Sequence, residues 1–238
     1  MNPLILSLCA SISTLIGFVM IKCSKKDIIK SSFALASGVM ISVSIFDLIP
    51  ESFIKLNSYF NIIPAILIMF IFFSLGVIIS MLIDKYIISD NEIYRVGVIS
   101  MIAVIIHNIP EGIATYIASN IDIKLGLNLA ISIALHNIPE GIIIALPIYY
   151  STKSKSRAFI YTFVAGMSEF IGALFSFIFL KDMINNLFIG IILSIIAGIM
   201  IQVSFYELIP NFIKEKSRRV VGYFLVGFIL MLLSIIII

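Results

Sequence analysis

The sequence predicts an all-α integral membrane protein of eight transmembrane helices, arranged as inverted repeats in a 3+2+3 pattern. Three observations predict this fold: a very apolar composition, eight long apolar segments joined by short loops, and motifs that recur in helices of opposite direction. Hydrophobic residues make up 61% of the 238 residues and charged residues only 12%. A soluble domain carries about a quarter charged residues. We therefore expect a single transmembrane domain over residues 1–238, in contact with the lipid bilayer along most of its length.

Eight segments are long enough to cross a bilayer, for which a helix needs about 20 largely apolar residues. The predicted spans are 3–21, 31–50, 62–83, 96–119, 125–150, 158–180, 186–210 and 220–238. The first segment lacks the preceding positive charge of a signal peptide, because the basic residues follow it instead. It is therefore predicted to be a transmembrane helix.

The basic residues of the loops predict the orientation in the cell membrane. Loops rich in Lys and Arg stay in the cytoplasm. Most of the 16 Lys and Arg residues fall in the first, third, fifth and seventh loops, and only Lys55, Lys124 and Lys181 fall in the others. The odd-numbered loops are therefore predicted to be cytoplasmic, and both termini extracytoplasmic.

Two sets of internal repeats lie in helices of opposite predicted direction. Residues 38–50 and 198–210 repeat each other at a constant offset of 160, and eight of the 13 positions are identical. The fourth and fifth segments each carry the hexapeptide His-Asn-Ile-Pro-Glu-Gly. Inverted repeats that meet at the membrane midplane are typical of secondary transporters.

The only two histidines of the chain lie in these hexapeptides, each four residues before a glutamate. Positions i and i+4 share one face of a helix, so each helix offers an imidazole and a carboxylate side by side. The side chains are His107, Glu111, His136 and Glu140, with the amides Asn108 and Asn137 one step round. Such mixed ligation suits zinc, iron or manganese and discriminates weakly among them.

Each hexapeptide also carries a proline and a glycine. A proline within a helix lacks an N–H and frees the carbonyl four residues before it. A freed carbonyl in a membrane must face protein or water, so those of Ile106 and Leu135 could line an ion path. The glycines that follow, Gly112 and Gly141, would permit close helix approach.

A purely structural role is the alternative, since intramembrane histidines often hydrogen-bond between helices and proline kinks are common in membranes. Two identical copies argue against it. Burying two carboxylates in lipid costs several kcal/mol unless they are paired or metal-bound. The predicted spans 96–119 and 125–150 hold no Lys or Arg to pair with them. A bound cation is the remaining natural partner.

Three further acids lie within predicted spans. Glu169 sits in the middle of the sixth segment with no basic residue at its depth, and is a candidate for a further ligand. Asp47 and Glu207 occupy equivalent positions of the repeat, near the ends of their helices. For these two, a solvated or capping role and a role in an ion pathway both stay open.

The duplicated hexapeptide, the Glu169 segment and the Leu-Ile-Pro helix ends resemble the ZIP (Zrt/Irt-like) metal transporters, in particular their bacterial zinc-uptake and GufA-like members. The resemblance implies a binuclear metal centre between the second, fourth, fifth and sixth helices, with bridging glutamates. One site would use His107, Glu111, His136, Glu140 and Met40, and the adjacent site Asn108, Glu111, Asn137, Glu140 and Glu169. It also implies uptake toward the cytoplasm, a homodimer, and an elevator-like motion of helices one, four, five and six.

The chain departs from the family pattern in two places. Many members have proline after the glutamate of the sixth helix, where this chain has Phe170. Many also carry a His-rich loop between the third and fourth helices, whereas residues 84–95 contain no histidine. A metal-sensing loop is therefore not expected.

The predicted function is uptake of divalent transition-metal ions by alternating access, zinc foremost, with iron, manganese, cobalt or cadmium as further candidates. The transported ion is substrate, and neither a resident cofactor nor a nucleic-acid partner is expected. The rival is an intramembrane metal-dependent hydrolase, which would want His-Glu-x-x-His rather than two copies of His-x-x-x-Glu, so no enzymatic activity is expected. A second rival is a structural or sensory membrane protein, against which the inverted repeats argue.

Overall fold

The computed structural model describes residues 2–23, 28–86, 90–180, 185–213 and 217–237, which are almost entirely helical (94%) and contain no strand. Eight of its helical stretches are long and apolar enough to cross a membrane. The prediction of an all-α protein with eight spans is confirmed. Two sequence-based assignments, Lys181 and the end of the last span at residue 238, lie outside the described residues.

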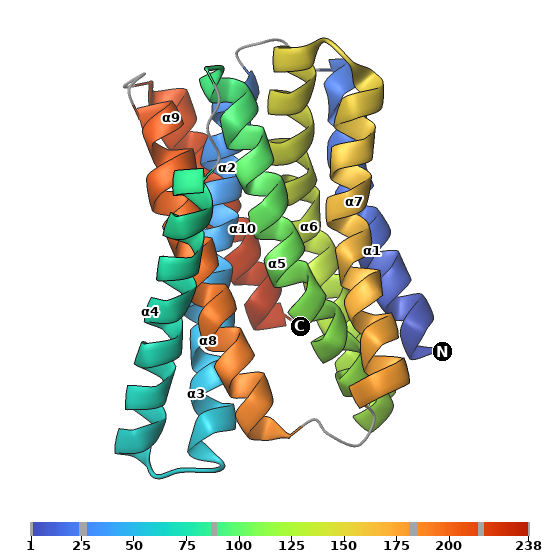
Figure 1. Cartoon of the computed structure of the whole chain (residues 1–238), viewed down its shortest axis with the longest axis vertical. Helices are drawn as coiled ribbons and strands as arrows, with labels where there is room; N and C mark the ends of the chain where they lie inside the picture. Colours follow the sequence, from blue (N-terminus) through green and yellow to red (C-terminus); the bar gives the residue numbers. More distant parts are fainter. Residues whose placement is uncertain (1, 24–27, 87–89, 181–184, 214–216, 238) are drawn as a thin grey trace.

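Ten α-helices make up these spans (Figure 1). They are α1 (Pro3–Val19), α2 (Ile28–Val43), α3 (Ile49–Asn57), α4 (Ile62–Tyr86), α5 (Glu92–Ile121), α6 (Ile123–Thr152), α7 (Lys155–Phe175), α8 (Asn186–Val203), α9 (Ile209–Ile213) and α10 (Arg218–Ile237). Two π-helical turns, Ser44–Leu48 and Ser204–Leu208, join α2 to α3 and α8 to α9, so that each pair forms one span.

The second span runs to Asn57, beyond the predicted end at residue 50. Pro50 does not end the helix, because it follows the π-helical turn in which the Ile49 N–H donates to the Ser44 carbonyl. The widened turn accommodates proline, which has no N–H to donate and whose ring would clash with the carbonyl four residues before it in a regular α-helix. Beyond it, α3 is amphipathic and buries Ser52 and Leu56. A prediction from apolarity alone therefore underestimates the length of this span.

Helices α5 and α6 form an antiparallel hairpin with a single residue between them. The Asp122 N–H donates to the Ala118 carbonyl at 2.9 Å and closes α5. The Asp122 carboxylate accepts from the Lys124 N–H at 2.8 Å and caps α6. A side chain that caps the next helix satisfies one of its otherwise unpaired donors. The two hexapeptides are therefore held in opposite orientation by the tightest connection of the fold.

The helices gather into two bundles (Figure 1). Helices α1, α5, α6 and α7 pack chiefly on one another and make up the bundle that we call the site bundle. Helices α2, α3, α4, α8, α9 and α10 make up the second, the outer bundle. The two bundles meet mainly where α2 lies against α6 and where α8 lies against α5.

The predicted inverted repeat, in which residues 38–50 and 198–210 match at an offset of 160, appears in the packing as well as in the sequence. Gly38 of α2 lies so close to α10 that a Cβ there would overlap the Phe224 carbonyl oxygen. Its repeat partner Gly198 of α8 lies against α4 in the same way, at the Phe73 carbonyl oxygen. Glycine in a membrane helix lets a neighbouring backbone approach closely. The pair α2–α10 and the pair α8–α4 are thus related copies.

Candidate metal centre

The two hexapeptides are joined across the α5–α6 interface by reciprocal hydrogen bonds. His107 Nε2 of α5 lies 3.0 Å from Glu140 Oε1 of α6. His136 Nε2 of α6 lies 3.3 Å from Glu111 Oε2 of α5. In each pair the ring N–H donates and the carboxylate accepts. All four side chains are at most 4% exposed. Each histidine is thus paired with the glutamate of the other copy and not with the one four residues ahead of it.

The two asparagines are also buried, and they join the hairpin to the flanking helices. The Asn108 amide donates to the Ala165 carbonyl of α7 at 3.3 Å. The Asn137 amide donates to the Ala10 carbonyl of α1 at 3.1 Å and to Glu169 Oε2 of α7 at 2.8 Å. Their side-chain carbonyl oxygens therefore stay available as acceptors or ligands.

Glu169 lies within the site bundle, fully buried on α7. Through Asn137 it is tied to the second hexapeptide, at the depth of the Glu111–His136 pair. A Cβ on Gly112, the residue after Glu111, would overlap the Glu169 main-chain carbonyl oxygen. The small residue at the end of the first hexapeptide therefore permits the close approach of α5 and α7 that the sequence predicts.

All seven candidate ligands in this bundle share one feature: each leaves one buried polar atom without a hydrogen-bonding partner among the described residues. The atoms are His107 Nδ1, Asn108 Oδ1, Glu111 Oε1, His136 Nδ1, Asn137 Oδ1, Glu140 Oε2 and Glu169 Oε1. Buried polar atoms are nearly always paired, and leaving one unpaired costs about 1–3 kcal/mol. The concentration of nitrogen and oxygen lone pairs here is what a cation would use.

These side chains are close together but do not form a closed metal cage. Among the described residues, no group of three or more His, Cys, Asp or Glu side chains is arranged to hold a metal ion. The reciprocal imidazole–carboxylate hydrogen bonds account for this, because they direct one ligand atom of each side chain at another. A cation that enters must replace these bonds with metal–ligand bonds.

The remaining candidate residues lie on the outer bundle. Met40 is buried in the apolar core of α2. Asp47 and Glu207 occupy the equivalent π-helical turns Ser44–Leu48 and Ser204–Leu208. Asp47 is half-buried and Glu207 is buried. Asp47 lies near enough to His136 and Glu111 to interact with them electrostatically, whereas the electrostatic neighbours of Glu207 are Asp84 and Arg95.

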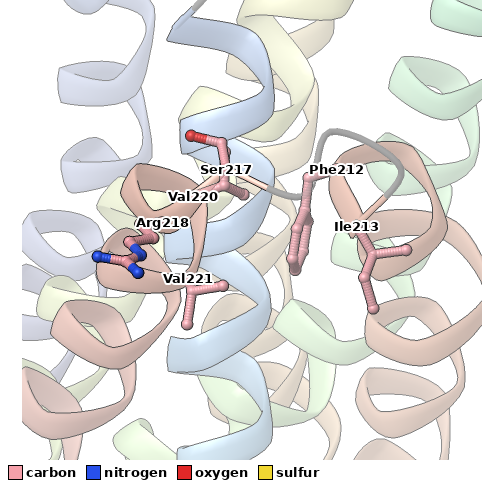
Figure 2. A pocket seen from close by; sticks show the side chains of 6 residues that line it. All are labelled: Phe212, Ile213, Ser217, Arg218, Val220 and Val221. Atoms are coloured by element: carbon pink, nitrogen blue, oxygen red, sulfur yellow. The ribbon is translucent and has the colours of Figure 1, made fainter.

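A surface hollow lies away from this centre (Figure 2). It lies where α9 meets the start of α10 and is lined by Phe212, Ile213, Ser217, Arg218, Val220 and Val221. Its walls are mainly apolar and offer one cation and no carboxylate. It has none of the ligand chemistry of the hexapeptides.

Sequence reasoning missed the parts of the centre that α1 supplies. The carbonyl oxygen of Ala10 bonds Asn137, and Thr14 is fully buried beside α7, its hydroxyl unpaired among the described residues. Backbone carbonyls give no residue-type signal. Thr14 is a neutral side chain in an apolar segment. The only available signal was a second repeat, between residues 10–17 and 165–172.

Fold and site together define a class: a multi-pass α-helical membrane protein with inverted repeats and buried imidazole, carboxylate and amide side chains between its central helices. The family model described as ZIP Zinc transporter matches residues 88–235, which cover α5 to α10. This chain belongs to the ZIP family, and the resemblance predicted from the hexapeptides is confirmed.

Relatives from several bacteria extend the likeness over nearly the whole chain. A protein named zinc transporter ZupT from Clostridium perfringens is 33% identical, over 98% of this chain and 93% of the relative. Proteins of the same name from Streptococcus mutans and Chlorobium luteolum are 36% and 35% identical. They cover 85% and 87% of this chain, and 83% and 86% of their own lengths.

Proposed function

We propose that this protein takes up divalent transition-metal ions across the cytoplasmic membrane, with Zn²⁺ the foremost substrate and iron, manganese, cobalt and cadmium as further candidates. The observation that carries the proposal is the pair of reciprocal bonds between two identical hexapeptides. Three relatives named as zinc transporters support the choice of zinc. Imidazole with carboxylate oxygen is a common zinc ligand set.

The proposed centre is binuclear. One ion is held by His107, Glu111, His136, Glu140 and Met40, and its neighbour by Asn108, Glu111, Asn137, Glu140 and Glu169. The unpaired oxygen and nitrogen atoms of these side chains support the assignment, except at Met40, which rests on the family resemblance. The glutamates bridge the two ions, because a carboxylate has an oxygen for each.

Transport proceeds by alternating access. The ion replaces the imidazole–carboxylate hydrogen bonds, and the site bundle then moves relative to the outer bundle in an elevator-like step. The limited contact between the bundles, chiefly α2–α6 and α5–α8, supports such a motion. Because inverted repeats give a chain two related conformations, the same contacts can close either side of the membrane.

The rest of the proposal concerns the setting in the cell. The basic odd-numbered loops support an orientation with both termini outside the cytoplasm, and the whole chain acts as one transmembrane domain, as a homodimer in the bilayer. Asp47 and Glu207 serve as pathway residues at the two ends of the route. The chain acts as a transporter and not as a hydrolase, because neither histidine is followed directly by a general base.

Zn²⁺ uptake into proteoliposomes tests the proposal. Glu111→Ala and Glu140→Ala are expected to abolish uptake, because each removes a carboxylate shared by both ions and leaves a histidine unpaired. Glu92→Ala, which removes an exposed carboxylate at the start of α5, is the matched control and should keep wild-type uptake. Full transport by either hexapeptide variant, in correctly inserted protein, would overturn the site assignment.

A further inference from the structure

The helices that flank the hexapeptides, α1 and α7, are copies of one another at an offset of 155 residues. Ala10-Ser-Ile-Ser-Thr-Leu-Ile-Gly17 matches Ala165-Gly-Met-Ser-Glu-Phe-Ile-Gly172 at alanine, serine, isoleucine and glycine. The shared residues have the same contacts. Ser13 Oγ donates to the Ala10 carbonyl and Ser168 Oγ to the Ala165 carbonyl, each at 2.6 Å.

The same relation holds where these helices meet the hexapeptides. Asn108 of α5 donates to the Ala165 carbonyl, and Asn137 of α6 donates to the Ala10 carbonyl. A Cβ on Gly112 would overlap the Glu169 main-chain oxygen, and one on Gly141 would overlap that of Thr14. The two halves of the site bundle are therefore related residue by residue. In this relation Thr14 is the counterpart of Glu169.

Thr14 has the properties of a ligand position and lacks only the charge. Its side chain is fully buried, and Oγ1 has no hydrogen-bonding partner among the described residues. It faces α7, since a Cβ on Gly166 would lie 3.1 Å from Thr14 Oγ1. The corresponding amide, Asn108, likewise has an unpaired Oδ1. A buried hydroxyl left unpaired costs free energy, which a ligand would recover.

The two halves lie at different depths. Glu169 contacts α5 at Gly112, beside the Glu111–His136 pair, whereas Thr14 contacts α6 at Gly141, beside the Glu140–His107 pair. In the proposed orientation α5 runs from the cytoplasm outward, so Glu111 is outside His107. Glu169 therefore belongs to the outer half of the centre, and Thr14 to the inner half.

We propose that the Thr14 hydroxyl joins two residues of the binuclear centre, Asn108 and Glu140, to form an inner station. The cation passes to this station after it leaves Glu169 and is bound there more weakly, so that it is released toward the cytoplasm. The inference rests on the proposed function and deepens it. A station with one carboxylate fewer binds a divalent cation less tightly, because ligand charge sets affinity. Because Thr14 stands where the related half-site has Glu169, the two half-sites differ in their affinity for the cation, and this difference favours movement of the cation toward the cytoplasm.

Zn²⁺ binding to the purified full chain and Zn²⁺ uptake into proteoliposomes test this station. Thr14→Glu is expected to tighten Zn²⁺ binding about tenfold and to slow uptake by a similar factor, because release becomes limiting. Thr14→Val, of similar shape without the hydroxyl, should slow uptake about tenfold, whereas Thr14→Ser should stay within about twofold. Ser13→Ala is the matched control, because that hydroxyl bonds its own helix.

A transposition distinguishes a ligand position from a packing position. Glu169→Thr alone should weaken Zn²⁺ binding, and adding Thr14→Glu should restore it at least in part, because the carboxylate returns at the related position. Should Thr14→Glu fail to insert, the contrast between Thr14→Val and Thr14→Ser decides. Equal uptake by Thr14→Val, Thr14→Ser and wild type, or no rescue by the double variant, would overturn the inference. Absence of uptake by the wild-type chain would instead overturn the proposed function.

Discussion

The two bundles follow the same inverted symmetry but bury different side chains. The site bundle encloses both histidines, three glutamates and two amides of the interior, at most 4% exposed. The outer bundle packs aliphatic side chains, serines and the paired methionines Met40 and Met200, and its acids Asp47 and Glu207 sit at π-helical turns. Buried ionisable groups in a membrane are costly and mark function. Symmetry relates the helices of both bundles, whereas the buried imidazole, carboxylate and amide side chains of the proposed centre all lie in the site bundle, with Met40 the one proposed ligand from the outer bundle.

The largest expected effect comes from removing the imidazoles. The double variant His107→Ala/His136→Ala should lower Zn²⁺ uptake on the order of 100-fold, because both reciprocal pairs and two nitrogen ligands are lost. Initial rates in proteoliposomes measure the effect. Met200→Leu, a volume-conserving change in the outer bundle, should stay within about twofold of wild type. If both variants transport equally well, the division of roles between the bundles is wrong.

Glycine substitutions test the close packing of the site bundle. Gly112→Ala places a methyl group against the Glu169 backbone, which cannot move aside without shifting α7. We expect a loss of stability of about 1–3 kcal/mol, seen as a lower unfolding temperature in detergent. Gly222→Ala on α10 is the control, since a Cβ there meets nothing within 4 Å. Equal unfolding temperatures for both variants would contradict the packing described.

Acid should inhibit transport through the site bundle. Ligation needs neutral imidazole and ionised carboxylates, so protons compete with the metal, and Zn²⁺ uptake should fall as pH falls from neutral to acidic. Glu207→Gln should lower uptake modestly and leave the shape of the pH profile unchanged, because the electrostatic neighbours of Glu207 are Asp84 and Arg95 and not the hexapeptides. A profile that stays flat in the wild type would exclude direct competition at the hexapeptides.

The smallest expected effect concerns the two repeat-related methionines. Both are buried, and the serine four residues after each donates to its carbonyl, at 2.8 Å for Met40 and 2.7 Å for Met200. Met40→Leu should weaken Zn²⁺ binding a few-fold, whereas Met200→Leu should not change it. Binding titrations of the purified chain measure the difference. Identical affinities would remove Met40 from the ligand set.

Much of the fold was predictable, because composition and segment length report directly on the lipid environment. The repeat at residues 38–50 and 198–210 was visible because eight of its 13 positions, including the closing Leu-Ile-Pro, are identical. The continuation past Pro50 was not, because the π-helical turn that accommodates this residue is a property of the backbone. The prediction ended that span at the proline.

The sequence predicted which residue types form the candidate site and which helix faces they share, but not which side chains hydrogen-bond to one another. Spacing of four places His107 and Glu111 on one face, yet only packing decides that His107 bonds Glu140. Thr14 escaped attention because its relation to Glu169 lies in small residues, and the one position that carries charge differs. Acids and histidines in an apolar segment can be recognised as candidate ligands from the sequence, whereas a neutral hydroxyl can be recognised only from its position in the fold.

X-ray absorption of the Zn²⁺-loaded chain tests the central claim most directly. We predict nitrogen and oxygen ligands with imidazole scattering at about 2.0–2.1 Å, lost in the His107→Ala/His136→Ala variant. Because these are the only histidines of the chain, any imidazole signal identifies the hexapeptides. A zinc spectrum without imidazole, or one that the double variant leaves unchanged, would contradict a transport site between α5 and α6.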